Sequence, residues 1–282
     1  MHPVTHRFTD SRWIRAIALF AALATSGVAQ AATAAASMCS THSPAHRVAL
    51  VELYSSEGCD SCPPADHWLG QWKDSGAAQS IVPLALHVDY WNSLGWTDRF
   101  SQHQFTERQQ SLTDLAGGHT VYTPEVFVSG RELRSWSQSA SFEARIDSVI
   151  KEPAAADVAL ELAPHPQGTP GFGIDARFTA RTASKDTLNA YVAVYENALV
   201  SQVRAGENRG ATLHHERVVR QWIGPVPLAA GSAQIRRAIT LDDANNSDSE
   251  MTDATGKYGV VAFVEDAATG EVLQVAELAA CH

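Results

Sequence analysis

The chain has 282 residues, of which 45% are hydrophobic and 18% are charged, and its formal net charge is −10 at pH 7. This composition is typical of a globular protein and excludes a largely disordered chain. The length predicts one large or two modest domains. The negative charge disfavours nucleic acids and anionic membrane surfaces as partners.

The N-terminus carries the pattern of a secretory signal peptide. Basic residues precede an apolar run of 13 residues at 16–28, and the small-x-small triplet Ala29-Gln30-Ala31 follows it. A run of this length is short for a membrane span. We therefore predict a signal peptide at residues 1–31, cleaved near Ala31, and a periplasmic or secreted mature chain without a membrane span. Cleavage removes three arginines and one aspartate, which changes the formal charge from −10 to −12.

After a linker predicted at residues 32–46, strand and helix patterns alternate up to residue 152. Apolar patterns predict strands at 47–54 and 80–91, a strand hairpin at 125–136, and helices directly after Cys62, at 101–116 and at 139–151. Strands that alternate with helices in this way predict an open sheet with helices on both faces. We therefore assign residues 47–152 to an α/β domain.

Helical periodicity almost disappears beyond Glu152-Pro153, and short strand patterns take its place. These patterns lie at 157–163, 172–181, 188–196, 199–204, 212–222, 234–241, 258–265 and 272–278. Many short strands separated by turn residues predict an antiparallel sandwich-like all-β domain, here at residues 153–282.

The most informative motif is Cys59-x-x-Cys62, which lies between the first strand and the first helix. Pro63 and Pro64 fit the first helical turn, where the backbone needs no N–H donor. Such a pair can be a redox dithiol, a structural disulfide or part of a metal site. A helix N-terminus favours the thiolate form of the first cysteine, and the second cysteine can then resolve a mixed disulfide.

Three stretches together resemble a known superfamily and family. They are VELYSSEGCDSCPPAD, LHVDYWNSLGWTD and VYTPEVFVSGR, with GENRG and HHERVVR further along the chain. The Cys pair and Thr123-Pro124 resemble the thioredoxin-like superfamily, and the fuller pattern resembles the secreted bacterial family DUF1223. The resemblance implies a thioredoxin-like domain at 47–152 and a cis Thr123-Pro124 peptide that faces the Cys pair and binds the substrate backbone.

We therefore predict an exported thiol–disulfide oxidoreductase that acts on protein or peptide thiols and disulfides. Cys59 is the expected attacking thiolate, Cys62 the resolving thiol, and Thr123 and Pro124 the substrate-binding residues. No cofactor, resident metal or oligomeric state is predicted. The alternatives are a copper- or zinc-handling protein and a non-catalytic binding module with the same fold. A metal site would have to be completed in space, and its candidate ligands include His67, His87 and His119.

Cys39 and Cys281 are the two remaining cysteines. Export implies an oxidising compartment, and the ends of a domain often lie close together. We therefore expect a structural disulfide between them, with two unpaired buried cysteines as the alternative.

Several other residues carry two interpretations each. Glu52 is either a buried acid that assists proton transfer or a strand-edge residue in water. The aromatic residues Tyr90, Trp91 and Trp96 pack either into the core or beneath a peptide partner. The loop 204–210 either only connects two strands or also contacts the first domain. The pair His214-His215 is expected on a strand with one imidazole outward.

Overall fold

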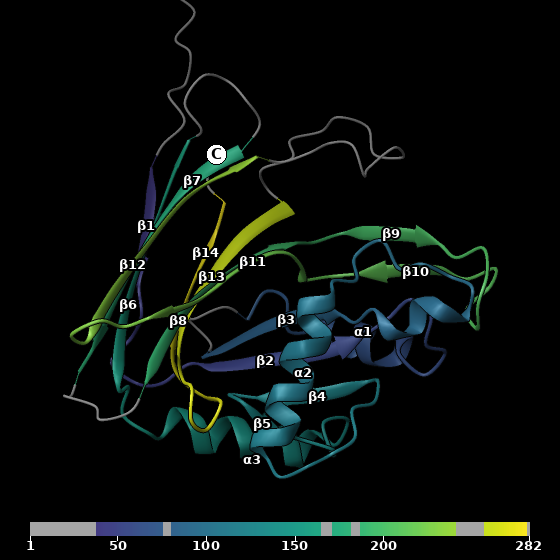
Figure 1. Ribbon diagram of the computed structural model, residues 1–282, viewed down its shortest axis with the longest axis horizontal. Helices are drawn as coiled ribbons and strands as arrows, with labels where there is room; N and C mark the ends of the chain where they lie inside the picture. Colours follow the sequence, from purple (N-terminus) through teal and green to yellow (C-terminus); the bar gives the residue numbers. More distant parts are fainter. Residues whose placement is uncertain (1–37, 76–79, 165–170, 182–186, 241–256, 281–282) are drawn as a thin grey trace, which may run out of the picture. The chain divides into compact units, whose positions relative to one another are not determined.

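A computed structural model describes residues 38–75, 80–164, 171–181, 187–240 and 257–280 (Figure 1). The predicted signal peptide at 1–31 and Cys281 lie outside these ranges. Among the described residues, none of the helices is both long and apolar enough to cross a membrane. The fold is mixed α/β and rich in strands, with one mixed and one antiparallel sheet as its main layers.

Within the described part of the chain, eight strands form the mixed sheet. In spatial order they are β14 (Glu271–Ala279), β13 (Tyr258–Asp266), β8 (Leu188–Glu196), β11 (Val218–Pro227), β3 (Ile81–His87), β2 (Ala49–Ser55), β4 (Glu125–Val128) and β5 (Arg131–Glu132). The strand β3 pairs in parallel with both β2 and β11. The other neighbours are antiparallel.

Helices cover the β2–β3 region of this sheet on both faces. They are α1 (Pro63–Gly70), α2 (His103–Leu115) and α3 (Ser139–Ile150), with a 3₁₀ helix, η2 (Tyr90–Leu94), between β3 and α2. Phe105 of α2 joins a cluster with Leu50 on one face. Leu69 of α1 and Phe142 of α3 pack with Leu53 on the other. Because side chains alternate along a strand, β2 and β3 supply both clusters and are apolar almost throughout.

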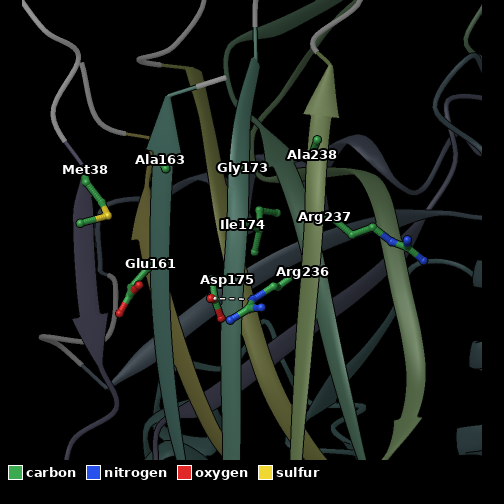
Figure 2. Close-up of a pocket in the computed structure, with 9 residues that line it drawn as sticks. All are labelled: Met38, Glu161, Ala163, Gly173, Ile174, Asp175, Arg236, Arg237 and Ala238. Atoms are coloured by element: carbon green, nitrogen blue, oxygen red, sulfur yellow. Dashed lines mark hydrogen bonds and ion pairs between the residues drawn. The ribbon is translucent and has the colours of Figure 1, made fainter. Parts of the chain in front are cut away.

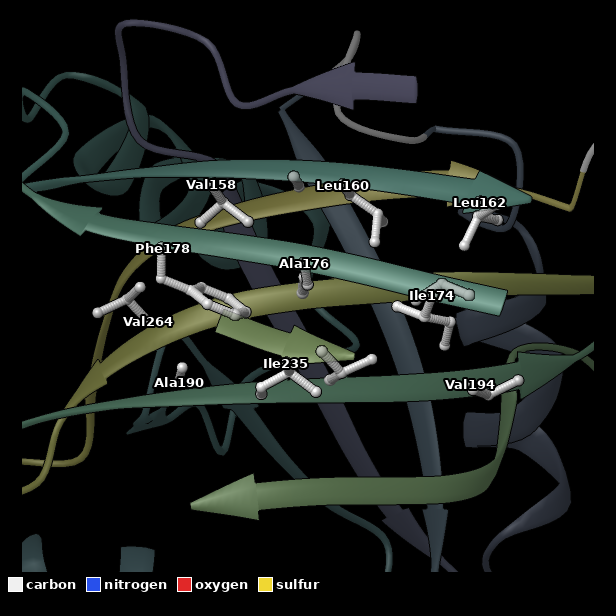
Figure 3. Packing of buried hydrophobic residues seen from close by; sticks show 14 of the residues in the cluster. Val158, Leu160, Leu162, Ile174, Ala176, Phe178, Ala190, Val194, Ile235 and Val264 are labelled. Atoms are coloured by element: carbon white, nitrogen blue, oxygen red, sulfur yellow. The ribbon is translucent and has the colours of Figure 1, made fainter. Parts of the chain in front are cut away.

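The antiparallel sheet packs against the β8, β13 and β14 side of the mixed sheet. Its strands are β1 (Cys39–His42), β6 (Ala156–Pro164), β7 (Gly171–Ala180) and β12 (Ser232–Thr240). Figure 3 shows the inward side chains of the two layers meeting: Leu160 and Phe178 lie opposite Val194 and Val264. The outward positions of β6 and β7 are less buried, as expected for strands whose side chains alternate between the core and the outer face of the sheet.

A separate two-stranded hairpin consists of β9 (Leu199–Gln202) and β10 (Thr212–His215). The stretch 212–222, expected as one strand, is interrupted at Glu216-Arg217, where Arg217 has a φ of 61°. The break separates β10 in the hairpin from β11 in the mixed sheet. The hairpin contacts α1 through β10, and Figure 1 shows it extending away from the antiparallel sheet.

The strand β1 was not expected. It lies within the predicted linker 32–46, and its small polar residues carry no strand pattern, but it pairs with β6 from Cys39↔Leu162 to His42↔Ala159. The Sγ atom of Cys39 lies 4.0 Å from the carbonyl oxygen of Ala279, two residues before Cys281. The predicted Cys39–Cys281 disulfide stays a prediction, because Cys281 lies outside the described residues.

The mixed sheet takes four strands from each side of the boundary predicted near residue 152. Its two parts meet where β11 joins β3: the amide of Ala85 donates a hydrogen bond of 2.9 Å to the carbonyl of Arg217. The division into two domains at that boundary therefore stays a prediction.

The buried side chain of Arg217 ties this junction together. Its Nε donates to the carbonyl of Pro83 at 2.9 Å, and its guanidinium pairs with Glu277 of β14. The guanidinium also lies 3.8 Å from the ring centroid of Tyr195 on β8. From the connection between β10 and β11, the side chain of Arg217 therefore contacts three strands of the mixed sheet, β3, β8 and β14.

We expect Arg217→Met to lower the free energy of unfolding by roughly 3–5 kcal/mol, because it leaves the buried Glu277 carboxylate uncompensated. Adding Glu277→Gln should recover part of this loss. The matched control is Arg236→Met, which breaks the exposed pair with Asp175 and should cost less than about 1 kcal/mol. Urea unfolding measures all three variants. Equal losses for the two single arginine variants would contradict the structural role of Arg217.

A pocket on the antiparallel sheet lies apart from the Cys pair (Figure 2). Its lining comes from Met38 and from β6, β7 and β12. Its acidic groups have cationic partners, since Asp175 accepts from Arg236 Nε at 3.0 Å and Glu161 from Arg177 Nη1 at 2.9 Å. We assign it no chemistry.

Candidate functional site

Cys59 and Cys62 form a disulfide, with their Cα atoms 5.5 Å apart. The pair lies between the end of β2 and the beginning of α1, whose N-cap residue is Cys62. Pro63 is the first helical residue, as the sequence predicted. Both cysteines are fully buried, so the disulfide lies beneath other parts of the chain.

The peptide bond between Thr123 and Pro124 is cis, and it lies beside the disulfide. The carbonyl oxygen of Thr123 is 3.8 Å from the Sγ atom of Cys59. The Thr123 hydroxyl accepts a hydrogen bond of 2.8 Å from Trp91 Nε1. The residues predicted as catalytic or substrate-binding are therefore neighbours in space, although more than sixty positions separate the two cysteines from Thr123 and Pro124 in the chain.

The loop 203–211 between β9 and β10 covers the Cys pair. Asn208 Nδ2 donates to the carbonyl oxygens of Glu57 at 2.9 Å and Cys59 at 2.8 Å. The Asp60 amide donates to Glu207 Oε2 at 3.2 Å. Gly206 has a φ of 72°, and a Cβ added there would lie 3.2 Å from the Cβ of Trp96. Of the two interpretations of GENRG, the contact with the first part of the chain is confirmed.

Five buried ionisable side chains cluster next to this loop. They are Glu57, Asp66 on α1, His87 at the end of β3, Asp98, and His215 at the end of β10. His87 Nδ1 lies 2.6 Å from Asp98 Oδ2, and His215 Nε2 lies 3.3 Å from Glu57 Oε1. His215 Nδ1 is 3.7 Å from Asp66 Oδ2, and the two imidazole centroids are 5.1 Å apart.

Burial and pairing act in opposite directions on these groups. Burial disfavours the charged imidazole of His87, but the charge and hydrogen bond of Asp98 outweigh it and raise the His87 pKa to about 9. For Asp98, burial is outweighed by the His87 charge, which lowers its pKa. Burial raises the pKa of Asp66 because its charged neighbours only partly compensate the loss of water.

Glu52 does not belong to this cluster. It is fully buried, so the interpretation as a strand-edge residue in water is wrong. Arg108 on α2 holds it, with Nε 2.7 Å from Glu52 Oε1, and also pairs with Glu265 at 2.8 Å. Leu50 and Tyr54 lie two positions from Glu52 along β2 and therefore share its face. Both belong to the cluster that packs against α2, on the opposite side of the sheet from α1. Its position favours a structural ion pair over proton transfer at the cysteines.

The histidines named as metal candidates are dispersed. His67 and His119 are exposed, whereas His87 is buried. His214 points outward and His215 inward, which confirms the expected strand orientation. The sequence did not indicate that Glu57, Asp66, Asp98 and His215 lie together. The available signals were His87 in an apolar stretch and acidic residues near the Cys pair and after η2, and only the fold brings them together.

Comparisons with known proteins place the chain in a family and a fold. The chain belongs to the family described as "Protein of unknown function (DUF1223)", which matches residues 50–264. No functionally curated protein matches it.

Two solved structures share the fold. The crystal structure of protein AGR_C_4864 from Agrobacterium tumefaciens has a TM-score of 0.56 and 21% identity, and the match covers 82% of this chain and 94% of that one. HBP35 of Porphyromonas gingivalis has a TM-score of 0.60 and 16% identity, with coverages of 84% and 76%. At these identities the likeness shows the fold alone.

The first prediction from the site concerns Glu125, which follows Pro124 and is buried. Burial raises its pKa from 4.5 to about 7, although Gln109 Nε2 donates to it at 2.6 Å. Below pH 4.5 both the folded and unfolded states hold this proton. Between 4.5 and about 7 only the folded state holds it, so stability falls as the pH rises through that window.

Glu125→Gln removes this contribution to the pH dependence. We expect the variant to gain roughly 1–2 kcal/mol over the wild type at pH 8 and little at pH 4, since one pKa unit corresponds to about 1.4 kcal/mol before screening by solvent. Urea unfolding at both pH values measures the difference. The control is Glu143→Gln, an exposed residue of α3. A variant that keeps the wild-type pH profile would show that Glu125 titrates normally.

The second prediction concerns the cover over the disulfide. Asn208→Ala removes two hydrogen bonds to the Cys59 loop. A loss of about 1 kcal/mol corresponds to a roughly five-fold faster opening. We expect dithiothreitol to reduce the disulfide faster by about that factor, as measured by maleimide trapping and gel shift. The control is Arg209→Ala in the same loop, which is exposed. Equal reduction rates in both variants and the wild type would exclude a protective role for Asn208.

Proposed function

We propose that this protein is an exported thiol–disulfide oxidoreductase whose residues 47–152 form a thioredoxin-like domain, followed by a sandwich-like domain at 153–282. The supporting observation is the Cys59–Cys62 disulfide at the N-terminus of α1, with the Thr123 carbonyl 3.8 Å from Cys59 Sγ. In this arrangement Thr123-Pro124 lies where an extended substrate segment would pass the reactive sulfur.

The proposed exchange transfers two electrons between the substrate and the Cys59–Cys62 pair. In the oxidising direction, a substrate thiolate attacks the Sγ atom of Cys59, and Cys62 leaves as a thiolate. A second substrate thiol then attacks the substrate sulfur that is bonded to Cys59 in the mixed disulfide. Cys59 leaves as a thiolate, so the substrate becomes a disulfide and Cys59 and Cys62 become a dithiol. In the reducing direction Cys59 attacks the substrate disulfide and Cys62 releases the reduced substrate.

The helix and the neighbouring side chains suit the first cysteine to this role. The positive end of the α1 dipole stabilises a thiolate near the N-terminus. The Ser61 hydroxyl lies 3.3 Å from Cys59 Sγ and can donate to a thiolate there. The aromatic rings of Trp91 and Trp96 are half-buried beside the site, and Leu94 between them is exposed. These groups favour an apolar peptide segment as the substrate.

The predicted signal peptide supports export, and an oxidising compartment would keep the Cys pair oxidised between turnovers. We therefore place the proposed activity in the periplasm or outside the cell. The substrate class is a protein or peptide that carries cysteine thiols or a disulfide.

The cysteine variants test the proposal. We expect Cys59→Ser to abolish exchange with a synthetic two-cysteine peptide disulfide, because no attacking thiolate remains. Cys62→Ser should accumulate a one-to-one mixed disulfide with the peptide, because the resolving thiol is missing. Mass spectrometry and a fluorescence assay of peptide reduction measure both.

The matched control is Ser61→Ala, which keeps both thiols. It should retain exchange and lose no more than a few-fold in rate, consistent with one weakened hydrogen bond. If both cysteine variants turn over peptide at the wild-type rate, exchange at this pair is excluded. Peptide binding that persists without turnover would instead favour the non-catalytic binding module.

A further inference from the structure

Three metal-ligating side chains converge from three separate elements. Asp66 comes from α1, His87 from the end of β3 and His215 from the end of β10. One donor atom of each lies within 4.8 Å of the corresponding atoms of the other two. All three residues are buried, with exposures of 7%, 0% and 2%. The three side chains are therefore held in place by the packed interior and are not free to move at the surface.

The donor atoms that face one another lack hydrogen-bond partners. His87 Nε2, His215 Nδ1 and Asp66 Oδ1 are inaccessible to solvent and make no hydrogen bond, and His215 Nε2 has the Glu57 carboxylate 3.3 Å away. Leaving such atoms unpaired costs about 1–3 kcal/mol each. A buried polar group without a partner calls for a specific explanation, and a bound cation would satisfy several of these atoms at once.

Two further carboxylates lie behind the imidazoles. Asp98 Oδ2 is 2.6 Å from His87 Nδ1, and Asp98 is itself held by the amides of Glu57 and Phe100 at 2.9 and 2.8 Å. Glu57 Oε1 is 3.3 Å from His215 Nε2. A metal-bound histidine almost always has such a carboxylate or carbonyl at its other ring nitrogen, which fixes the tautomer and orients the ring.

The charge balance of the cluster points the same way. Three carboxylates, Glu57, Asp66 and Asp98, face two imidazoles in a buried space. The three carboxyl groups outnumber the two imidazoles. A divalent cation supplies the missing positive charge without requiring that both imidazoles carry an extra proton.

We infer that Asp66, His87 and His215 form a binding site for one divalent transition-metal ion of the zinc class. His87 Nε2, His215 Nδ1 and one Asp66 oxygen are the ligands, and Asp98 and Glu57 orient the two histidines. Two imidazoles and one carboxylate suit Zn²⁺, Co²⁺ or Fe²⁺. Donor atoms at about 2.0–2.2 Å from a tetrahedral ion lie roughly 3.3–3.6 Å from one another. The three donor atoms now lie within 4.8 Å of one another, so side-chain shifts of about 1 Å bring them to binding distance.

This site is distinct from the proposed exchange activity and contains no cysteine. The ion would join α1, which follows the Cys pair, to the hairpin that carries the covering loop. Its formation does not depend on the oxidation state of Cys59 and Cys62. Failure of the exchange proposal and failure of the metal proposal are therefore distinguishable.

The test uses the mature, oxidised chain after treatment with a chelator. Zn²⁺ is added in an isothermal titration, and Co²⁺ is added while the visible d–d absorption is recorded. We expect one ion per chain and a tetrahedral or five-coordinate Co²⁺ spectrum. Asp66→Asn and His215→Gln should each weaken Zn²⁺ binding by at least about 100-fold, and Asp98→Asn by about 10–100-fold. Far-ultraviolet circular dichroism checks that each variant is folded.

Two controls keep the assignment specific. His214→Gln changes the adjacent exposed imidazole, and Cys59→Ser/Cys62→Ser removes both thiols; both should bind Zn²⁺ as the wild type does. The proposal is overturned if the wild type binds no stoichiometric Zn²⁺ or Co²⁺, which does not depend on any variant folding. It is equally overturned if the double cysteine variant loses the ion, or if His214→Gln weakens binding as much as His215→Gln.

Discussion

The parallel pairing of β11 with β3 is the constraint on which the candidate site depends. Only Val218↔Ala85 is a registered pair, supported by the Ala85 amide bond to the Arg217 carbonyl. Arg217 reinforces this short contact with its bond to Pro83 and its ion pair with Glu277. Because β10 ends just before β11 begins, this junction fixes where His215 and the covering loop lie. The second half of the chain therefore completes a site whose cysteines belong to the first half.

The candidate site combines two features that ordinarily oppose each other. A redox pair needs access to a partner, but Cys59 and Cys62 have no exposed surface. Ionisable groups are ordinarily solvated, but five of them lie buried beside the pair. Both features have one cause: β10 of the hairpin contacts α1, His215 packs against His87 at the end of β3, and Asn208 of the covering loop bonds to Cys59. The position of that hairpin determines how far the sulfur atoms and the buried charges can interact with anything outside the chain.

The sequence predicted most of the elements because their signals are local. Apolar periodicity located β2, β3, α2 and α3, and the prolines after Cys62 located the beginning of α1. Thr123-Pro124 was placed beside the Cys pair through the family resemblance rather than through periodicity. The contacts of Asn208 with Cys59, and of His215 with Glu57, depend on sheet pairing across about 150 residues. No local pattern encodes that pairing, and the small polar residues of β1 likewise form a strand only because β6 offers an edge.

The order of strands along the chain has a consequence for how the protein folds. The strand β3 is apolar and fully buried, and its partner β11 is more than 120 residues further along the chain. Until β11 is made, the side of β3 that faces away from β2, including the Ala85 amide that later bonds to Arg217, is an unpaired edge of the kind that pairs with other chains. This edge stays uncovered while residues 88–217 are being made. A chain cut near residue 152 would keep the Cys pair and all three helices, but it would lose the covering loop and His215 and leave the Ala85 amide without its partner. Such a fragment would therefore combine an incomplete site with an edge that favours aggregation.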